Sequence, residues 1–341
     1  MKKRLISFLK LAVTALALAW MIQSGLLSFQ SIILALKNPA ILFISAITLL
    51  ICQCLGVYRW MQFVRHVVPG ANLSQCMRYH AIGLFFSSVL PGVVSGDIIK
   101  AVYVAKDLGQ SRVSIFSTVI VDRIFGLAGV ILLAGVGALL SLALGSELSS
   151  SWHGLMSSVL FLNVGLFLGI FMLYKSSVLN LLLSFLASRN LALCHHLAKL
   201  LTSIRQICPP KLWVFNQILV SVFIHALVTM SCYLFHLSML SPEGGTVLDW
   251  HTFFKFLSVT PVGLLVAAIP ILPGGLGTGH ASFESFYRMI GLQSGAEVFT
   301  LLFITQFLFG LMGGAYYFWL LARGMLKAPP HELLHSETLP K

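Results

Sequence analysis

Residues 90–100 read LPGVVSGDIIK, which puts a proline, two glycines, an aspartate and a lysine into an otherwise apolar segment. Proline lacks a backbone N–H, and glycine tolerates backbone angles that other residues avoid. Pro91, Gly92, Ser95 and Gly96 therefore predict a break in a helix. If this segment lies in a bilayer, the freed backbone groups must line a cavity or be buried by protein. The stretch predicts a polar site at membrane depth.

Four charged residues are expected to gather at this site. At 1.5 Å per helical residue from Lys106, Asp97 lies about 13 Å deep and Lys100 about 9 Å deep. Asp122 and Arg123 follow Arg112 at a similar depth. Each charge inside a membrane costs about 2.5–3.5 kcal/mol on insertion scales, so four at one level require mutual pairing or a ligand. Lys100 and Arg123 would present positive charge to an anionic headgroup while the two aspartates orient them. The alternative is a salt-bridge network that only holds helices together.

A second glycine-rich break lies near the end of the chain, in AAIPILPGGLGTGHASFESFYR. Glycine N–H groups that precede a helix can form an anion cradle. The residues of this break are Pro273, Gly274, Gly275 and Gly277. His280, Glu284 and Arg288 recur every four residues and so share one helical face, where they could also contact a ligand. For His280, a hydrogen-bonded interfacial histidine is an equally good interpretation.

Composition identifies the class of protein. Of 341 residues, 58% are hydrophobic and 9% are charged, whereas a soluble domain carries about 25% charged residues. This is typical of an all-α polytopic membrane protein. The net charge of +12 is assigned to loops that face anionic lipid headgroups, because no nucleic-acid-binding motif is present. The six cysteines form no paired metal motif, and no cofactor is indicated. Six stretches are long enough to span a bilayer: 5–27, 40–60, 114–145, 154–174, 212–240 and 297–322.

Charge placement predicts the topology. Basic residues mark the N-terminus, a loop with Arg59, Arg65 and Arg78, and the regions near Lys106 and Arg323. The positive-inside rule places these points, and so both termini, in the cytoplasm. Segments 79–104 and 252–292 should then be broken re-entrant hairpins that enter from opposite sides, as in an inverted repeat. The alternative is eight full spans. We expect one transmembrane domain over 1–328, with an interfacial helix at 176–207, and a short cytoplasmic tail at 329–341.

Three motifs in this order resemble the lysylphosphatidylglycerol synthase transmembrane-region family, also called flippase-like membrane proteins. The matching residues are Leu90, Pro91, Gly92, Ser95, Gly96, Asp97 and Lys100; Asp122, Arg123, Gly126 and Leu127; and Pro273, Gly274, Gly275, Leu276 and Gly277. The chain resembles the flippase half of the multiple peptide resistance factor alone, so the resemblance implies no synthase activity. Many members have a glutamate where this chain has His280, which leaves the role of that position open.

The expected function is movement of an anionic phospholipid or lipid-linked headgroup across the bacterial inner membrane, with membrane lipids as partners and no enzymatic step. A cavity closed alternately by the two hairpins would carry the headgroup. An ion- or proton-coupled transporter of a small solute would show the same broken helices and buried charges. A membrane enzyme that acts on a polyprenyl phosphate is a weaker alternative, because few carboxylates are available for Mg²⁺. The sequence does not indicate the oligomeric state.

Overall fold

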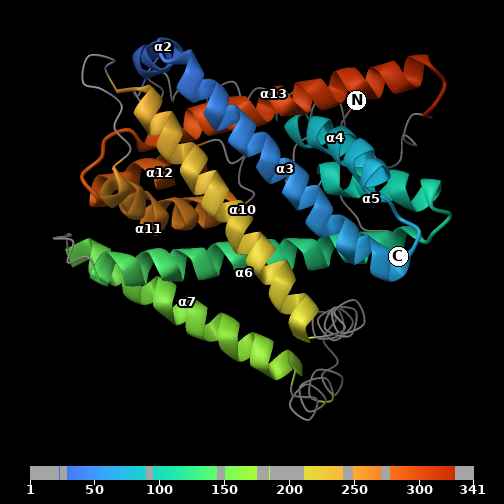
Figure 1. The fold of residues 1–341 in the computed structure, drawn as a ribbon, viewed down its shortest axis with the longest axis horizontal. Coiled ribbons are helices and arrows are strands. Elements are labelled where there is room, and N and C mark those ends of the chain that lie inside the picture. The colour runs from blue at the N-terminus through green and yellow to red at the C-terminus, as the bar shows by residue number, and fades with distance from the viewer. Residues whose placement is uncertain are drawn as a thin grey trace, which may run out of the picture.

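The computed structural model describes residues 29–89, 95–143, 150–174, 211–240, 249–269 and 277–326, together with the single residues Gln23 and Ser184. The regular elements in these ranges are α-helices (Figure 1). Their bounds are α2 Phe29–Leu36, α3 Pro39–Val67, α4 Leu73–Val89, α5 Ser95–Asp107, α6 Arg112–Ala143, α7 Ser150–Tyr174, α10 Lys211–Ser238, α11 Trp250–Ala267, α12 Thr278–Met289 and α13 Gly295–Ala322. The expected all-α class is confirmed.

Six helices in the described part of the chain are long and apolar enough to cross a membrane. Five of them, α3, α6, α7, α10 and α13, correspond to predicted spans, and the sixth is α11. The chain is therefore a multi-pass membrane protein. The predicted first span at 5–27 falls outside the described residues apart from Gln23, the predicted interfacial helix at 176–207 apart from Ser184, and the tail at 329–341 entirely.

The long helices define two ends of the bundle. At one end, which we call the basic end, α3 leads into α4, α5 leads into α6, and α13 finishes (Figure 1). At the opposite end Asn38 Nδ2 donates to the Ser238 carbonyl over 2.8 Å, and His236 Nδ1 lies 2.8 Å from Ser294 Oγ. These contacts bring the start of α3, the end of α10 and the start of α13 together.

The first broken segment is a hairpin of α4 and α5 that starts and finishes at the basic end. The two helices approach closely because Gly83 and Gly96 lack side chains: a Cβ on Gly96 would clash with the Gly83 carbonyl oxygen. The end of α4 also packs on the middle of α13, where a Cβ on Gly310 would meet Ser88. The described end of α4 thus lies beside the middle of α13 and does not reach the opposite end.

The second hairpin, α11 and α12, starts and finishes at the opposite end (Figure 1). Asp249 begins α11 by accepting hydrogen bonds from the backbone of His251 and Thr252 at 3.1 and 3.0 Å, as an N-cap residue does. α12 returns toward the start of α13, where a Cβ on Gly295 would clash with the Phe283 carbonyl oxygen. Although α11 has the length and hydropathy of a span, its partner therefore returns to the end from which α11 began.

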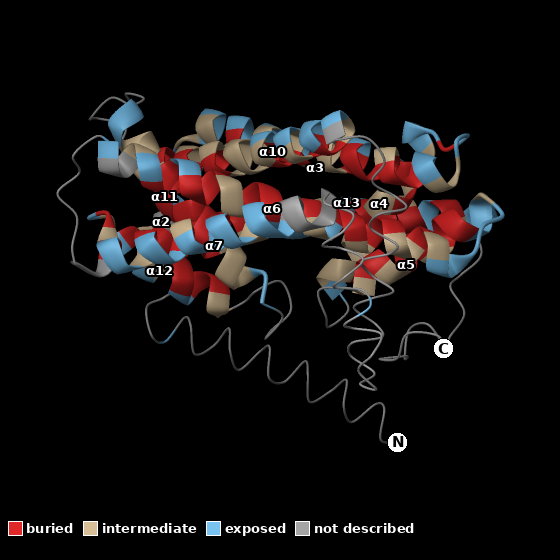
Figure 2. Cartoon of the chain, turned by 90° about the horizontal axis from the view of Figure 1, so that it is seen from below, coloured by how far each residue is buried: buried red, intermediate tan, exposed pale blue. Residues whose placement is uncertain are grey.

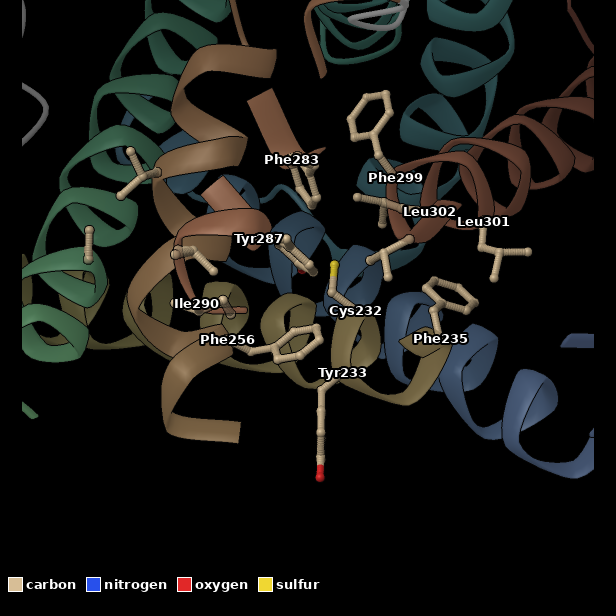
Figure 3. Close-up of a cluster of buried hydrophobic side chains, with 14 of the residues drawn as sticks. Cys232, Tyr233, Phe235, Phe256, Phe283, Tyr287, Ile290, Phe299, Leu301 and Leu302 are labelled. Atoms are coloured by element: carbon tan, nitrogen blue, oxygen red, sulfur yellow. The ribbon is translucent and has the colours of Figure 1, made fainter. Parts of the chain in front are cut away.

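Each hairpin sits over its own apolar core. The core at the opposite end joins α10, α11, α12 and α13 through side chains such as Phe256, Phe283 and Tyr287 (Figure 3). The second core, at the basic end, joins α3, α4, α5, α6 and α13 around Trp60 and Ile82. Buried residues lie along the helices of both halves of the bundle (Figure 2).

The two halves of the chain repeat one packing pattern in opposite orientation. The first half runs α3–α4–α5–α6 and the second runs α10–α11–α12–α13, with α3 and α10 packed antiparallel along their lengths, from Asn38 against Ser238 to Arg59 against Ser221. The hairpin of each half packs on the last helix of the other half: Gly313 of α13 meets Ala81, and Gly137 of α6 meets Leu257. Two oppositely oriented hairpins around a pseudo-two-fold centre match the predicted inverted repeat.

Candidate functional site

The charged site is built where α5 begins and meets α6. Asp97 lies in the first turn of α5, and its side chain is 6% exposed. Lys100 Nζ lies 2.8 Å from Asp97 Oδ1, one turn further along the same helix. Arg123 reaches over from α6 and places both Nε and Nη2 on Asp97 Oδ2, at 2.8 and 2.7 Å. Both oxygens of this buried carboxylate are therefore engaged by cations, as the high cost of an unpaired charge requires.

Lys100 is held in place from two further directions. Its ammonium lies 4.6 Å from the centre of the Trp60 ring, which supplies a cation–π contact. Gly83 of α4 lies against the Lys100 Cβ: a Cβ added to Gly83 would be 3.2 Å from it. The Lys100 side chain is only 7% exposed. Lys100 therefore neutralises Asp97 and is itself covered by neighbouring helices.

The second predicted pair, Asp122 and Arg123, separates into two different networks. Asp122 does not orient Arg123, as the sequence suggested, but binds Arg59: Arg59 Nε lies 2.8 Å from Asp122 Oδ1. Arg59 Nη1 also donates to Ser221 Oγ over 2.6 Å. Successive helical residues point about 100° apart, so Asp122 faces Arg59 of α3 while Arg123 faces α5.

The assignment of Arg59 to a basic loop was wrong. It lies inside α3, and its side chain is 8% exposed. The sequence carried a signal for this position, because the helix-compatible apolar run of α3 continues past Arg59 to Val67. A charge within such a run should have been read as a buried ionic residue with a partner. Trp60 and Ser221, which complete the two networks, were also missed.

Arg123 differs from every other member of these networks in its exposure. Its side chain is 57% exposed, whereas those of Asp97, Lys100, Arg59 and Asp122 are each 11% exposed or less. It lies eleven residues into α6, or about 16 Å along the helix axis. α6 has 32 residues and is about 48 Å long, longer than a hydrocarbon core of about 30 Å. If α6 is centred in the bilayer, the guanidinium lies about 7 Å inside the apolar layer.

The residues of the second break do not join this site. His280 is buried on α12, where its Nε2 lies 3.1 Å from Thr300 Oγ1 and its ring packs against Phe299. Glu284 pairs with Arg288 at 2.6 Å and accepts from the backbone N–H of Ala296 at 3.2 Å. The hydrogen-bonded histidine that the sequence left open is thus the arrangement found for His280. Glu284 thus connects α12 to the start of α13, and Arg288 is its ion-pair partner on α12.

Several residues of the predicted breaks fall outside the described part of the chain, namely Pro91, Gly92, Pro273, Gly274 and Gly275. Ser95 and Gly96 are described and form the start of α5. Gly277 precedes α12 with a φ of 81°, which favours glycine. Both hairpins point their described tips at α13: Ser88 meets Gly310, and Gly279 meets Phe299. These two contacts are eleven residues apart on α13, about 16 Å along its axis.

No cluster of three or more histidine, cysteine, aspartate or glutamate residues that could hold a metal ion occurs among the described residues. At Asp97 a guanidinium is presented outward and is fixed by a buried carboxylate, a chemistry that suits an anionic ligand. Arginine suits phosphate because its planar donors match phosphate oxygens. A single exposed guanidinium at this depth can bind an anionic group that enters the bundle.

Comparisons with known proteins agree with this description of a membrane protein. Residues 7–321 match the family model described as the lysylphosphatidylglycerol synthase TM region. A curated relative, a UPF0104 membrane protein of Pyrococcus horikoshii, is 22% identical over 317 residues, which cover 87% of this chain and 90% of the relative. No solved structure matches the chain.

Proposed function

We propose that this chain, which belongs to the lysylphosphatidylglycerol synthase TM region family, moves an anionic lipid headgroup between the leaflets of a bacterial cytoplasmic membrane. One observation carries the proposal: a guanidinium that is 57% exposed inside a membrane span. Such a charge is tolerated in a bilayer when it faces water or an anionic partner. A lipid headgroup supplies that partner while its acyl chains stay in the apolar layer.

The two hairpins provide the means to open the site from either side. Each begins and finishes at its own end of the bundle, and their described tips meet α13 at Gly310, near its middle, and at Phe299, near its start. Rocking of one repeat against the other would expose the interior first to one leaflet and then to the other. Glycine contacts such as Gly313 on Ala81 give smooth surfaces on which such a movement can occur.

The charge distribution supports an orientation with the basic end in the cytoplasm. Among the described residues, Arg65, Arg78, Lys106, Arg112 and Arg323 lie there with Asp107 as their acidic neighbour. The opposite end carries Lys37, Lys255 and Arg288 together with Asp249, Glu284 and Glu297, so it has no excess of cations. Under the positive-inside rule the α4–α5 hairpin would enter from the cytoplasm. The proposal involves no covalent chemistry.

Reconstituted protein tests the proposal. Vesicles that contain a trace of acyl-labelled phosphatidylglycerol are treated with a membrane-impermeant quencher, which reports how fast label from the inner leaflet becomes accessible. Wild-type protein should accelerate this exchange, and Arg123→Ala or Lys100→Ala should slow it. Arg112→Ala, at the exposed start of the same helix, is the matched control and should behave like wild type. Equal exchange by Arg123→Ala, Lys100→Ala and wild type would refute the site assignment.

A further inference from the structure

We infer that the site is matched by charge to a phosphodiester that carries a single negative charge and no amine, such as the headgroup of phosphatidylglycerol. This inference rests on the proposed function and narrows its substrate class. The cluster on α5 and α6 holds two cations, Lys100 and Arg123, and one carboxylate, Asp97. Its formal charge is therefore +1, whereas the neighbouring Arg59–Asp122 pair is neutral.

The surplus charge is located on the group that a ligand can reach. Lys100 is covered by α4 and by Trp60, and its ammonium is already bound to Asp97. Arg123 uses Nε and Nη2 on one oxygen of Asp97, which leaves the Nη1 edge of an exposed guanidinium directed away from that carboxylate. An entering headgroup thus meets one cationic edge. One phosphodiester charge would neutralise the cluster.

A zwitterionic headgroup fits this surface poorly. Its ammonium lies only a few bonds from its phosphate and would need an accessible carboxylate beside Arg123. Asp97 is 6% exposed, with both oxygens bound by cations. Asp122 is 11% exposed and is held by Arg59. Among the described residues, the next acid on these helices is Asp107, ten residues after Asp97 and about 15 Å away along α5.

A phosphomonoester fits poorly for the opposite reason. Its phosphate carries a charge of about −1.5 to −2 at neutral pH. One accessible cation would leave part of that charge uncompensated inside the apolar layer. Arg59, the nearest further arginine in the described networks, already serves Asp122 and Ser221 and is 8% exposed. The cluster therefore selects against excess negative charge as well as against an amine.

Parallel exchange measurements with three labelled lipids test this inference. The full-length protein is reconstituted with a trace of labelled phosphatidylglycerol, phosphatidylethanolamine or phosphatidic acid in the same neutral matrix. We expect phosphatidylglycerol to exchange at least about tenfold faster than the other two lipids. A tenfold difference corresponds to about 1.4 kcal/mol, and one uncompensated charge at this depth costs more than that. Arg123→Gln makes the cluster neutral and should remove this preference. Arg123→Lys keeps the charge and should retain it, and Arg112→Gln is the control for an unrelated cation.

The outcomes separate the inference from the proposal on which it rests. If wild-type protein moves all three lipids equally, or favours phosphatidylethanolamine or phosphatidic acid, charge matching is refuted while lipid movement stands. If Arg123→Gln retains the wild-type preference, the surplus charge does not set selectivity. If no lipid moves faster than in empty vesicles, both the inference and the proposed function fail. The wild-type comparison needs no variant, so it decides the matter even if Arg123→Gln does not fold.

Discussion

Replacing Asp97 with asparagine should destabilise the protein by about 3–5 kcal/mol, the usual cost of removing one partner from a buried ion pair. The structure places this loss mainly at Lys100. The Lys100 side chain is 7% exposed and would keep its charge with no carboxylate beside it. Arg123 loses the same partner, but its 57% exposure lets solvent or lipid compensate, so it contributes about 1 kcal/mol or less.

Reversible unfolding in mixed detergent micelles, followed by circular dichroism, measures this difference. Asp107→Asn is the matched control on the same helix, because Asp107 is exposed and should change stability by no more than about 0.5 kcal/mol. Adding Lys100→Met to Asp97→Asn removes the stranded charge and should recover most of the loss, which gives a coupling energy for the pair. If Asp97→Asn costs no more than Asp107→Asn, the ionic cluster is not buried as described.

Two further substitutions test the packing around the site. Arg59→Gln should lower the free energy of unfolding by about 3–5 kcal/mol in the same assay, because it leaves Asp122 buried without its cation. Additional replacement of Asp122 by asparagine should recover part of this loss. A cost below about 1 kcal/mol would contradict the pairing. Gly313→Leu should cost about 1–3 kcal/mol or more, because its side chain would collide with the Ala81 backbone of α4. Gly165→Leu on α7, where nothing lies within 4 Å of the added atom, is the control, and equal effects of the two leucines would refute the close approach of α13 to α4.

The helical class and the two broken segments could be predicted from local sequence. Proline and glycine break a helix wherever they occur, and apolar runs of about 20 residues are required to cross a bilayer. The packing of the hairpins could not be predicted in this way. Whether Gly313 faces Ala81 or lipid depends on how α13 and α4, more than 200 residues apart, are arranged.

The charged cluster was predicted in part. Asp97, Lys100 and Arg123 were expected to associate because charges at one depth in a membrane need partners. The partner of Asp122 could not be chosen from the sequence, because Asp122 and Arg123 are adjacent but face different helices. That choice is made by α3, which supplies Arg59. Because Arg59 was assigned to a loop, it was not considered as the cation that Asp122 binds.

The exposure of Arg123 also could not be predicted from the sequence. A buried arginine and an accessible one have the same residue type, and both Arg59 and Arg123 lie inside long, largely apolar helices. Their difference arises from covering: α6 and α10 enclose Arg59, while the side chain of Arg123 keeps 57% of its surface open. This exposure is the feature on which the proposed function depends.

Thiol accessibility at position 123 tests that feature most directly. In a variant that lacks the six native cysteines, Arg123→Cys is compared in vesicles with Phe161→Cys, which replaces a 77% exposed residue near the middle of α7. Both are treated with a charged, membrane-impermeant thiol reagent. We expect rapid modification at position 123, because this position opens to a polar space, and slow modification at position 161, which faces lipid. If position 123 is as unreactive as position 161, the guanidinium faces lipid and the proposed headgroup site does not exist.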